Sequence, residues 1–589
     1  MSKNSSRRLP VEILGEIFSC VVGQIQLHIP EFHPAGSPSP WDVALVCRDW
    51  WNVVHSTPCL WSNISLKVRY DSQTRHKCLA LLSVWNLCLE RSRRHPLAIK
   101  FTVVSASGFN NRDSGNGELS ILSALFLKPL MEHIPRWETV ALCVSLDTLL
   151  SYLSLNGPVQ YTCLRRLCID HGYRTFTENS VGLFRDAPLL SCVSLSELPY
   201  RDSSFDDDDI GIPSSKISHL SQLPWSQISH LSLSADKGDF DNLLDILRNT
   251  PNLITFEYWI SYNYYSDEDP LPLELSHLEQ IEFSNWCHES DDGSPAAPFF
   301  KILNAPQLST LEVEGVCGDR ELESIQGCLQ RSRCSIKCLT LPSPCLSFLL
   351  SLTPDVETLV FSNSLIRPDD DNYSIESPFD DRPLPEVELA HLQKFVWSIN
   401  YNEADDEDGR DAVSQLFGLL MAPQLSVLEV VGECCDRELD GIRGFLQRSG
   451  CSLKSLKFST PRLLSFLSVT PDIESLALPS CNEEVLMSPL QNLTFDHSAS
   501  SWLCPKLKKI VLDFDITAGR LFDAFITMLK SRLSPPRNSL VRLQSFELEL
   551  GKRVPKHMKS LVQREMTSQE PLAITYARQV PSHDDQWDL

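Results

Sequence analysis

The segment APQLSTLEVEGVCGDRELESIQGCLQRSRCS at 305–335 returns 117 residues later as APQLSVLEVVGECCDRELDGIRGFLQRSGCS at 422–452. The match continues without a gap through TPDVETL (353–359) and TPDIESL (470–476), and upstream LSHLEQIEF echoes LAHLQKFVW. Internal self-similarity is the sequence signature of a repeat protein. We therefore expect a duplicated block that covers residues 270–361 and 383–479.

A shorter phrase recurs inside and outside this block, with apolar residues at its first, fourth and sixth positions. Its alternating end, as in LSTLEV (308–313), suits a strand, and stretches between copies, such as FDNLLDILRN (240–249), have helical spacing. A strand followed by a helix, many times over, is typical of a solenoid. The fifteen copies begin at residues 137, 164, 190, 228, 253, 278, 308, 336, 356, 392, 425, 453, 473, 507 and 543.

The phrase resembles the leucine-rich repeat, which implies parallel strands stacked on a concave face. The repeat lengths vary, and the Asn or Cys that normally follows the phrase is mostly missing, which puts the smoothness of the curve in doubt but not the stacking. The predicted fold class is α/β, with a solenoid over residues 131–551 and a C-terminal cap or tail over 552–589.

The first residues of the chain have a different pattern. Pro10 suits the first turn of a helix, and apolar residues follow at three- and four-residue spacing in LPVEILGEIFSCVV (9–22). A second helix is predicted after Ser39, a possible N-cap, with Val43, Val46 and Trp50 on its apolar stripe. Two such short helices cannot bury these residues against each other, so the next domain or another protein must cover them.

The fragments LPVEILGEIF (9–18), ALVCRDWWNVV (44–54) and STPCLWSNI (56–64) resemble the F-box, in the version common in mushroom-forming fungi. The resemblance implies a tail (1–8), a small all-helical F-box (9–64) and a connecting region (65–130). In that family the motif binds the Skp adaptor of cullin-RING ubiquitin ligases. We expect Phe18, Val53 and Trp61 in the motif's own core. The positions that the resemblance assigns to adaptor binding are Leu9, Pro10, Glu12, Ile13, Leu14, Ile17, Leu45, Val46, Cys47 and Trp50. The alternative is an N-terminal helical cap of the repeat array.

The composition restricts the partners and the compartment. The formal net charge of −24 over 589 residues argues against nucleic acid or an anionic membrane as the main partner, since both favour basic proteins. The charge is explained either by solubility or by a basic partner. The 20 cysteines lack a regular framework, and the sequence has neither an apolar signal core nor a membrane-spanning run, so we expect a reduced, intracellular protein of the cytoplasm and/or nucleus.

No catalytic motif, metal-site spacing or cofactor motif occurs in the sequence, so we expect neither enzymatic activity nor a cofactor. The favoured hypothesis is a substrate-recognition subunit of an SCF-type cullin-RING ubiquitin ligase. Its F-box would dock on the Skp adaptor of the cullin complex, and its repeats would hold an unknown client protein. Outward strand positions such as Glu312 and Glu429 are weak candidates for client binding. The alternatives are an adaptor-bound interaction scaffold without ubiquitin transfer, and an enzyme with an unrecognised site in the solenoid.

Overall fold

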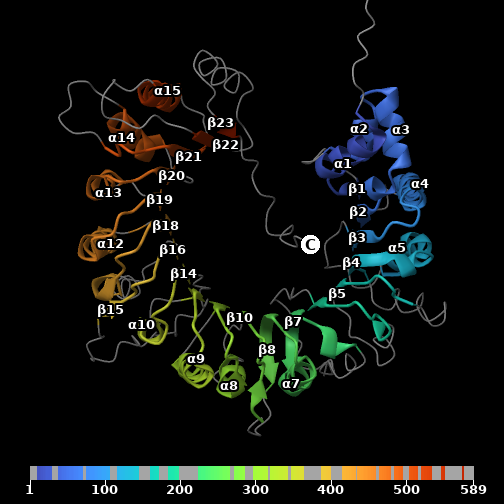
Figure 1. The fold of residues 1–589 in the computed structure, drawn as a ribbon, viewed down its shortest axis with the longest axis horizontal. Helices are drawn as coiled ribbons and strands as arrows, with labels where there is room; N and C mark the ends of the chain where they lie inside the picture. The colour runs from blue at the N-terminus through green and yellow to red at the C-terminus, as the bar shows by residue number, and fades with distance from the viewer. Residues whose placement is uncertain are drawn as a thin grey trace, which may run out of the picture. The chain divides into compact units, whose positions relative to one another are not determined.

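The computed structural model describes most of the chain in two compact units, Met1–Leu278 and Glu279–Leu589. The described residues are 9–29, 38–70, 75–105, 116–144, 160–171, 184–197, 223–264, 271–285, 296–315, 319–342, 347–363, 386–399, 414, 416–432, 434, 436–458, 463–478, 483–494, 503–514, 519–533, 545–550 and 573–575. Strands and helices alternate through both units (Figure 1).

The first unit begins with helices and continues as a parallel sheet. Strands β1 to β8 pair in chain order, each parallel to the next, and helices α4, α5 and α7 lie on one side of them (Figure 1). Its elements are α1 (Val11–Val21), β1 (Ile25–Ile29), α2 (Pro40–Ala44), α3 (Arg48–Ser56), η1 (Pro58–Trp61), β2 (Asn63–Tyr70), α4 (Arg75–Arg91), β3 (Leu97–Ser105), α5 (Asn116–Met131), η2 (Ile134–Arg136), β4 (Trp137–Cys143), β5 (Arg166–His171), β6 (Cys192–Glu197), η5 (Trp225–Gln227), β7 (His230–Asp239), α7 (Phe240–Arg248), β8 (Thr255–Tyr264) and β9 (Leu273–Glu274).

The second unit repeats the same plan. Its main sheet runs in the order β10, β12, β13, β14, β16, β18, β19, β20, β21, β22 and β23, every pair parallel. The elements are β10 (Gln280–Asn285), α8 (Ala296–Ile302), β11 (Leu303–Asn304), β12 (Thr310–Gly315), α9 (Asp319–Ser332), β13 (Cys338–Leu341), α10 (Ser347–Leu350), β14 (Thr358–Asn363), β15 (Val387–Glu388), β16 (Lys394–Ile399), β17 (Leu420–Met421), β18 (Val427–Val431), α12 (Asp436–Ser449), β19 (Ser455–Phe458), α13 (Leu463–Val469), β20 (Ser475–Leu478), α14 (Glu483–Leu493), β21 (Lys509–Phe514), α15 (Gly519–Leu533), β22 (Ser545–Leu550) and β23 (Ala573–Thr575).

Each of the fifteen phrases coincides with a strand, so the α/β class and the parallel sheet predicted from the sequence are confirmed. In β12 the apolar Leu311 and Val313 are buried, and Glu312 between them is half-buried on the opposite face. We call this opposite face the open face. Its side chains alternate along each strand with those that enter the core. The core of each unit therefore lies between the sheet and its helices.

The prediction of an all-helical segment at residues 9–64 is wrong, because β1 lies inside it. Ile25 and Leu27 are buried and pair in register with Ile64 and Leu66 of β2. The two-residue alternation of IQLHI is a strand pattern, which the neighbouring Gly and Pro residues obscure. Strands β2 and β3 then continue the same sheet through the region expected to be a connection (65–130). Beyond residue 551 the structure describes β23, which pairs with β22.

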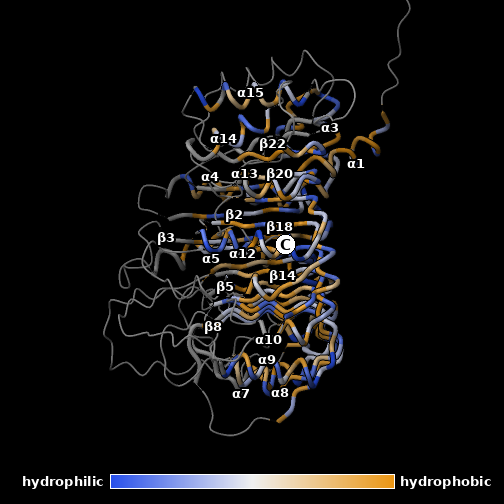
Figure 2. The backbone as a smooth tube through the Cα atoms, turned by 90° about the vertical axis from the view of Figure 1, so that its left-hand side faces the viewer, coloured by the Kyte–Doolittle hydropathy of each residue, from blue (hydrophilic) through white to orange (hydrophobic). Residues whose placement is uncertain are grey.

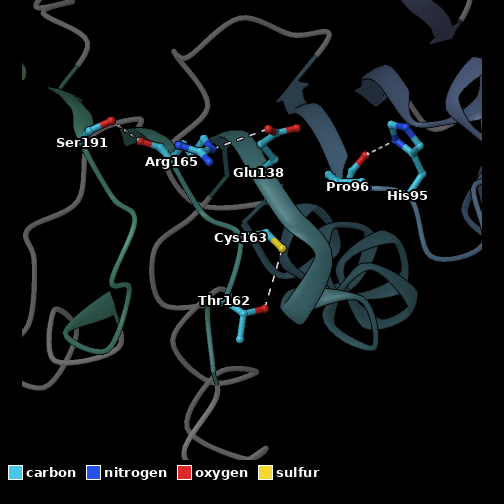
Figure 3. A network of polar contacts seen from close by, with 7 residues as sticks. All are labelled: His95, Pro96, Glu138, Thr162, Cys163, Arg165 and Ser191. Atoms are coloured by element: carbon cyan, nitrogen blue, oxygen red, sulfur yellow. Dashed lines mark hydrogen bonds and ion pairs between the residues drawn. The ribbon is translucent and has the colours of Figure 1, made fainter.

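The edge where the strands begin is held by a backbone ladder. The carbonyl of Glu279 accepts hydrogen bonds from the amides of Ser309 and Thr310, and the carbonyl of Ser309 does the same for the next turn. Figure 3 shows this edge in the first unit, where Arg165 forms an ion pair with Glu138 at 3.8 Å and its carbonyl accepts from Ser191 Oγ. This ladder joins successive turns through backbone groups, in the absence of the regular asparagine of leucine-rich repeats.

Arginines at the ends of three helices tie each helix to the preceding turn. Arg331 Nη2 donates to the carbonyl of Phe300 at 2.6 Å, and Arg448, its counterpart in the duplicated block, donates to the carbonyl of Phe417. Arg532 of α15 donates to the carbonyl of Leu493 at the end of α14. Helix C-termini leave carbonyls without intrahelical partners, so each arginine satisfies groups that would otherwise be unbonded.

A serine beside each of the first two arginines gives a matched pair for a test. Ser449 Oγ accepts from the amide of Ala422 at 3.0 Å, and Ser332 Oγ accepts from the amide of Ala305 at 2.9 Å. Ser449→Ala should leave a buried donor unsatisfied at a cost of about 1–3 kcal/mol, and hydrogen exchange at Ala422 should accelerate by about tenfold or more. Ser332→Ala is the reciprocal control, because it should accelerate exchange at Ala305 alone. Unchanged exchange at Ala422 in Ser449→Ala would contradict this role.

Candidate functional site

Helix α1 carries more apolar residues than the side that packs on the rest of the unit covers. Gly15 and Phe18 are buried against the rest of the unit, whereas Ile13, Ile17 and Val21, spaced four residues apart, are exposed. Figure 2 shows α1 coloured as hydrophobic over much of its length. The apolar stripe of a surface helix normally faces the core. We call Ile13, Ile17 and Val21 the outward stripe of α1, because the described residues of this chain leave them exposed.

Helices α2 and α3 extend this apolar surface. Ser39 caps α2 through a reciprocal capping box, in which Ser39 Oγ accepts from the amide of Asp42 at 3.3 Å and Asp42 Oδ2 accepts from the amide of Ser39 at 2.8 Å. The hydrogen bonds from Ser39 lower the pKa of the Asp42 carboxyl. The turn that follows α2 presents Leu45 and Val46, which are 78% and 61% exposed.

Aromatic packing holds the three helices on the first turn of the sheet. The rings of Phe18 and Trp50 lie 4.8 Å apart, and Trp41 meets Trp61 edge-on at 5.1 Å. Trp61 is fully buried, donates from Nε1 to the carbonyl of Val54 at 2.9 Å, and lies under the Arg91 guanidinium of α4 at 4.4 Å. The predicted core positions Phe18, Val53 and Trp61 are all buried, which confirms that expectation.

Most of the residues that sequence reasoning assigned to adaptor binding are exposed. Leu14 and Trp50 are half-buried, and Trp50 contributes to packing through its contact with Phe18. Three exposed apolar residues were missed, namely Val11, Val21 and Trp51; their neighbours in α1 and α3 indicated helix faces, but periodicity does not tell which face is covered. The exposed members of the predicted set are Leu9, Pro10, Glu12, Ile13, Ile17, Leu45, Val46 and Cys47. We call the exposed apolar residues of this region the helical surface: Leu9, Val11, Ile13, Ile17, Val21, Leu45, Val46 and Trp51.

The open face of the second unit is the other candidate binding surface. Glu312 and Glu429 both lie on it, half-buried, at equivalent positions of the duplicated block. Glu429 accepts ion pairs from Lys394 at 2.8 Å and Lys457 at 4.0 Å. Glu312 instead lies opposite Glu282 in register. The structure therefore places the two weak client-binding candidates on one face, beside different register neighbours.

Metal ligands and cysteine thiols are the two kinds of catalytic group whose surroundings the described residues define. Within them, no group of three or more His, Cys, Asp or Glu side chains could hold a metal ion. The described cysteines form no disulfide with one another, and burial raises the pKa of the Cys168 and Cys328 thiols to about 11 and of the Cys88 and Cys504 thiols to about 12. Such thiols stay protonated at neutral pH and are poor nucleophiles. Among the helices described, none combines the length and the hydrophobicity needed to cross a bilayer.

Comparisons with known proteins do not assign this chain to a family. No family model matches the sequence, and no curated protein matches it. Among solved structures, the crystal structure of a TLR13–ssRNA13 complex is similar with a TM-score of 0.32 and 15% sequence identity, over 71% of this chain and 53% of that chain. The chain thus spans about half the length of that structure. The fold described above is established by the strand pairing of the chain itself.

Proposed function

We propose that this chain is the substrate-recognition subunit of an SCF-type cullin-RING ubiquitin ligase, with an F-box at its N-terminus and irregular leucine-rich repeats after it. The helical surface would dock on the Skp adaptor, and the repeats would hold a client protein. The chain itself would be non-catalytic, and its effect would be proximity, because tethering raises the client's effective concentration near the ubiquitin-conjugating enzyme. The proposal places the protein in the cytoplasm and/or nucleus.

The outward stripe of α1 is the observation that carries this proposal. A helical cap of the repeat array would account for the buried side of α1, for β1 and for the packing of Trp61. It gives no reason for Ile13, Ile17 and Leu45 to be apolar and exposed. Burial of each such side chain is worth roughly 1.5–3 kcal/mol, so a partner that covers this surface would gain substantial binding free energy.

Reconstitution from purified components tests the proposal directly. The full chain should copurify with the Skp adaptor, and the binary complex should then retain the N-terminal half of a cullin on a size-exclusion column. Absence of the adaptor from the complex would remove the F-box interpretation. Adaptor binding without cullin would instead favour the interaction scaffold that lacks ubiquitin transfer.

Labelling of Cys47 provides an independent check of where the adaptor binds. Cys47 is exposed and follows Leu45 and Val46, so iodoacetamide should modify it in the free chain. We expect the bound adaptor to slow that modification at least tenfold, since a docked protein excludes reagent from the residues it covers. Cys163, half-buried near the start of β5, is the internal reference and should label at the same rate in both samples. Unchanged labelling of Cys47 in a complex that does form would place the adaptor elsewhere.

A further inference from the structure

The two copies of the duplicated block are alike in their interior. Leu311 and Val313 of β12 correspond to Leu428 and Val430 of β18, and all four side chains are buried. Packing inside the block therefore does not require the copies to differ on the open face. The open faces nevertheless differ in positive charge.

Two lysines on the open face occur in the second copy alone. Lys394 of β16 and Lys457 of β19 form ion pairs with one carboxylate, that of Glu429 in the strand between them, at 2.8 and 4.0 Å. The corresponding residues of the first copy are the uncharged Gln280 and Thr340. The two lysine side chains remain 42% and 40% exposed. Because they share one carboxylate, one positive charge is left over.

Three more lysines lie at the edge where neighbouring strands begin. The amide of Glu474 donates to the carbonyl of Lys454, and the amide of Lys508 donates to the carbonyl of Glu474, so these residues lie side by side on consecutive turns. Lys508 Nζ donates to Glu474 Oε2 at 2.6 Å, and Lys506 Nζ lies 2.6 Å from Asp472 Oδ1. The hydrogen bond from Lys508 and the charges of Lys454 and Lys506 lower the pKa of the Glu474 carboxyl. Here three lysines face two carboxylates.

We call these five lysines the lysine face: Lys394, Lys454, Lys457, Lys506 and Lys508. They face three carboxylates, so two positive charges remain when all of their ion pairs are formed. The rest of the chain is acidic, with a formal net charge of −24 overall. Charges farther away than about 8 Å are largely screened at physiological ionic strength, so a ligand on this surface responds to the local positive excess.

Small side chains lie on the open face between these lysines. Ser455 of β19 pairs in register with Ser475 of β20, and Lys457 pairs with Ala477. These small residues are half-buried, so they do not keep a bound backbone away from the lysines. Neighbouring strands are about 4.8 Å apart, so the four steps from β16 to β21 span about 19 Å. An extended chain covers that distance with roughly six residues.

We propose that the lysine face is the client-binding site and that its ligand is an acidic, extended segment of the client. Each lysine ammonium has three donors, so it can pair with a ligand carboxylate and keep its partner within the chain. The ligand carboxylates would neutralise the two remaining positive charges, which a neutral or basic segment would not. This inference rests on the proposed function for the existence of a client, but its geometry comes from the lysine face alone.

Selection from a random twelve-residue peptide display library tests the proposal on the full chain. We expect the enriched peptides to carry several acidic residues within about six consecutive positions, the span of the lysine face. Lys454→Glu with Lys457→Glu turns the excess of two positive charges into an excess of two negative charges. This reversal should weaken binding of a selected wild-type peptide at least tenfold in fluorescence anisotropy. It should also select basic peptides, which a misfolded variant would not do specifically.

The matched control reverses two charges in the first copy. Lys337 is the counterpart of Lys454 and pairs with Glu357 at 3.8 Å, and Arg320 of α9 is exposed. Lys337→Glu with Arg320→Glu therefore changes the net charge equally outside the lysine face, and this variant should select the same acidic peptides as the wild type.

Four results would overturn the proposal. They are enrichment of no acidic peptide, equal loss of binding in the control, a dimer of this chain that the Lys454→Glu, Lys457→Glu reversal dissociates in light scattering, and tighter binding of a twelve-nucleotide oligothymidylate than of the selected peptide. The last result would assign the lysine face to nucleic acid. Copurification of the adaptor, measured on the same samples, reports separately on the proposed function.

Discussion

Replacement of Ile13 and Ile17 together by aspartate should abolish copurification of the Skp adaptor while the repeats stay folded. Both side chains lie on the outward stripe of α1 and are 47% and 42% exposed, so each keeps surface that a partner can bury. Each would lose roughly 0.7–1.5 kcal/mol of burial on docking, about half the value for a full side chain, and desolvation of the new carboxylates would add to the loss. The combined loss corresponds to a decrease in affinity of roughly 10²–10⁴-fold, measured by titration of labelled adaptor.

Helix α5 offers a control with the same chemistry and spacing. Ile121 and Leu125 are also four residues apart, and they are 63% and 42% exposed. Ile121→Asp with Leu125→Asp therefore changes charge and apolar surface to the same extent outside the helical surface, and should leave adaptor binding unchanged. Equal loss of binding in both double variants would point to general destabilisation and would contradict a specific docking site on α1. Circular dichroism of both variants should match that of the wild type.

Replacement of Arg532 by methionine should give the largest loss of stability among single changes considered for the second unit. The guanidinium is fully buried and donates to the carbonyls of Leu493, Cys504 and Leu503 at 2.8, 2.8 and 2.7 Å. Burial lowers its pKa to about 10, so the group stays charged at neutral pH. Methionine would fill the space but leave these carbonyls without the arginine, at a cost of about 3–5 kcal/mol.

The effect of Arg532→Met should be local and measurable by hydrogen exchange. Amides of α14 and α15 should exchange at least a hundredfold faster, whereas those of β12 and α9 should keep their rates. Lys530→Met, an exposed change on the same helix, should alter neither. If the amides of α15 exchange at the wild-type rate in Arg532→Met, the guanidinium makes no net contribution to the free energy of unfolding. The cost of its desolvation would then cancel the gain from its hydrogen bonds.

The repeated phrase predicted the strands well because its alternation of apolar and other residues is the pattern of a strand with one buried face. Fourteen of its copies begin two residues before the strand, and the copy at 137 begins with it. The first apolar residue lies in the preceding turn, as Leu308 does when its amide donates to the carbonyl of Ala305. The phrase thus combines the turn and the strand of each repeat, and short-range periodicity is sufficient to find it.

The strands that the sequence did not predict either lack the repeated phrase or carry it within a segment that also resembles another motif. Trp61, Ile64 and Leu66 do form the phrase at the start of β2, but the same residues close the F-box-like segment and were assigned to it. Strand β23, described over only Ala573–Thr575, is too short to carry the phrase. For the helical surface, the spacing of apolar residues located α1 correctly, but only packing decides that Phe18 lies inside and Ile17 outside.

The pairing of β1 with β2 has a mechanical consequence for any complex that forms on α1. Five consecutive residue pairs, from Ile25 with Ile64 to Ile29 with Val68, join the strand that follows α1 to the first turn of the array. Helix α1 ends at Val21 and β1 begins at Ile25, so only three residues connect the helix to the sheet. A partner bound to α1 would therefore keep a fixed orientation relative to the first repeats. The direction in which those repeats point away from such a partner would therefore be set by the fold of the first unit and not by a tether.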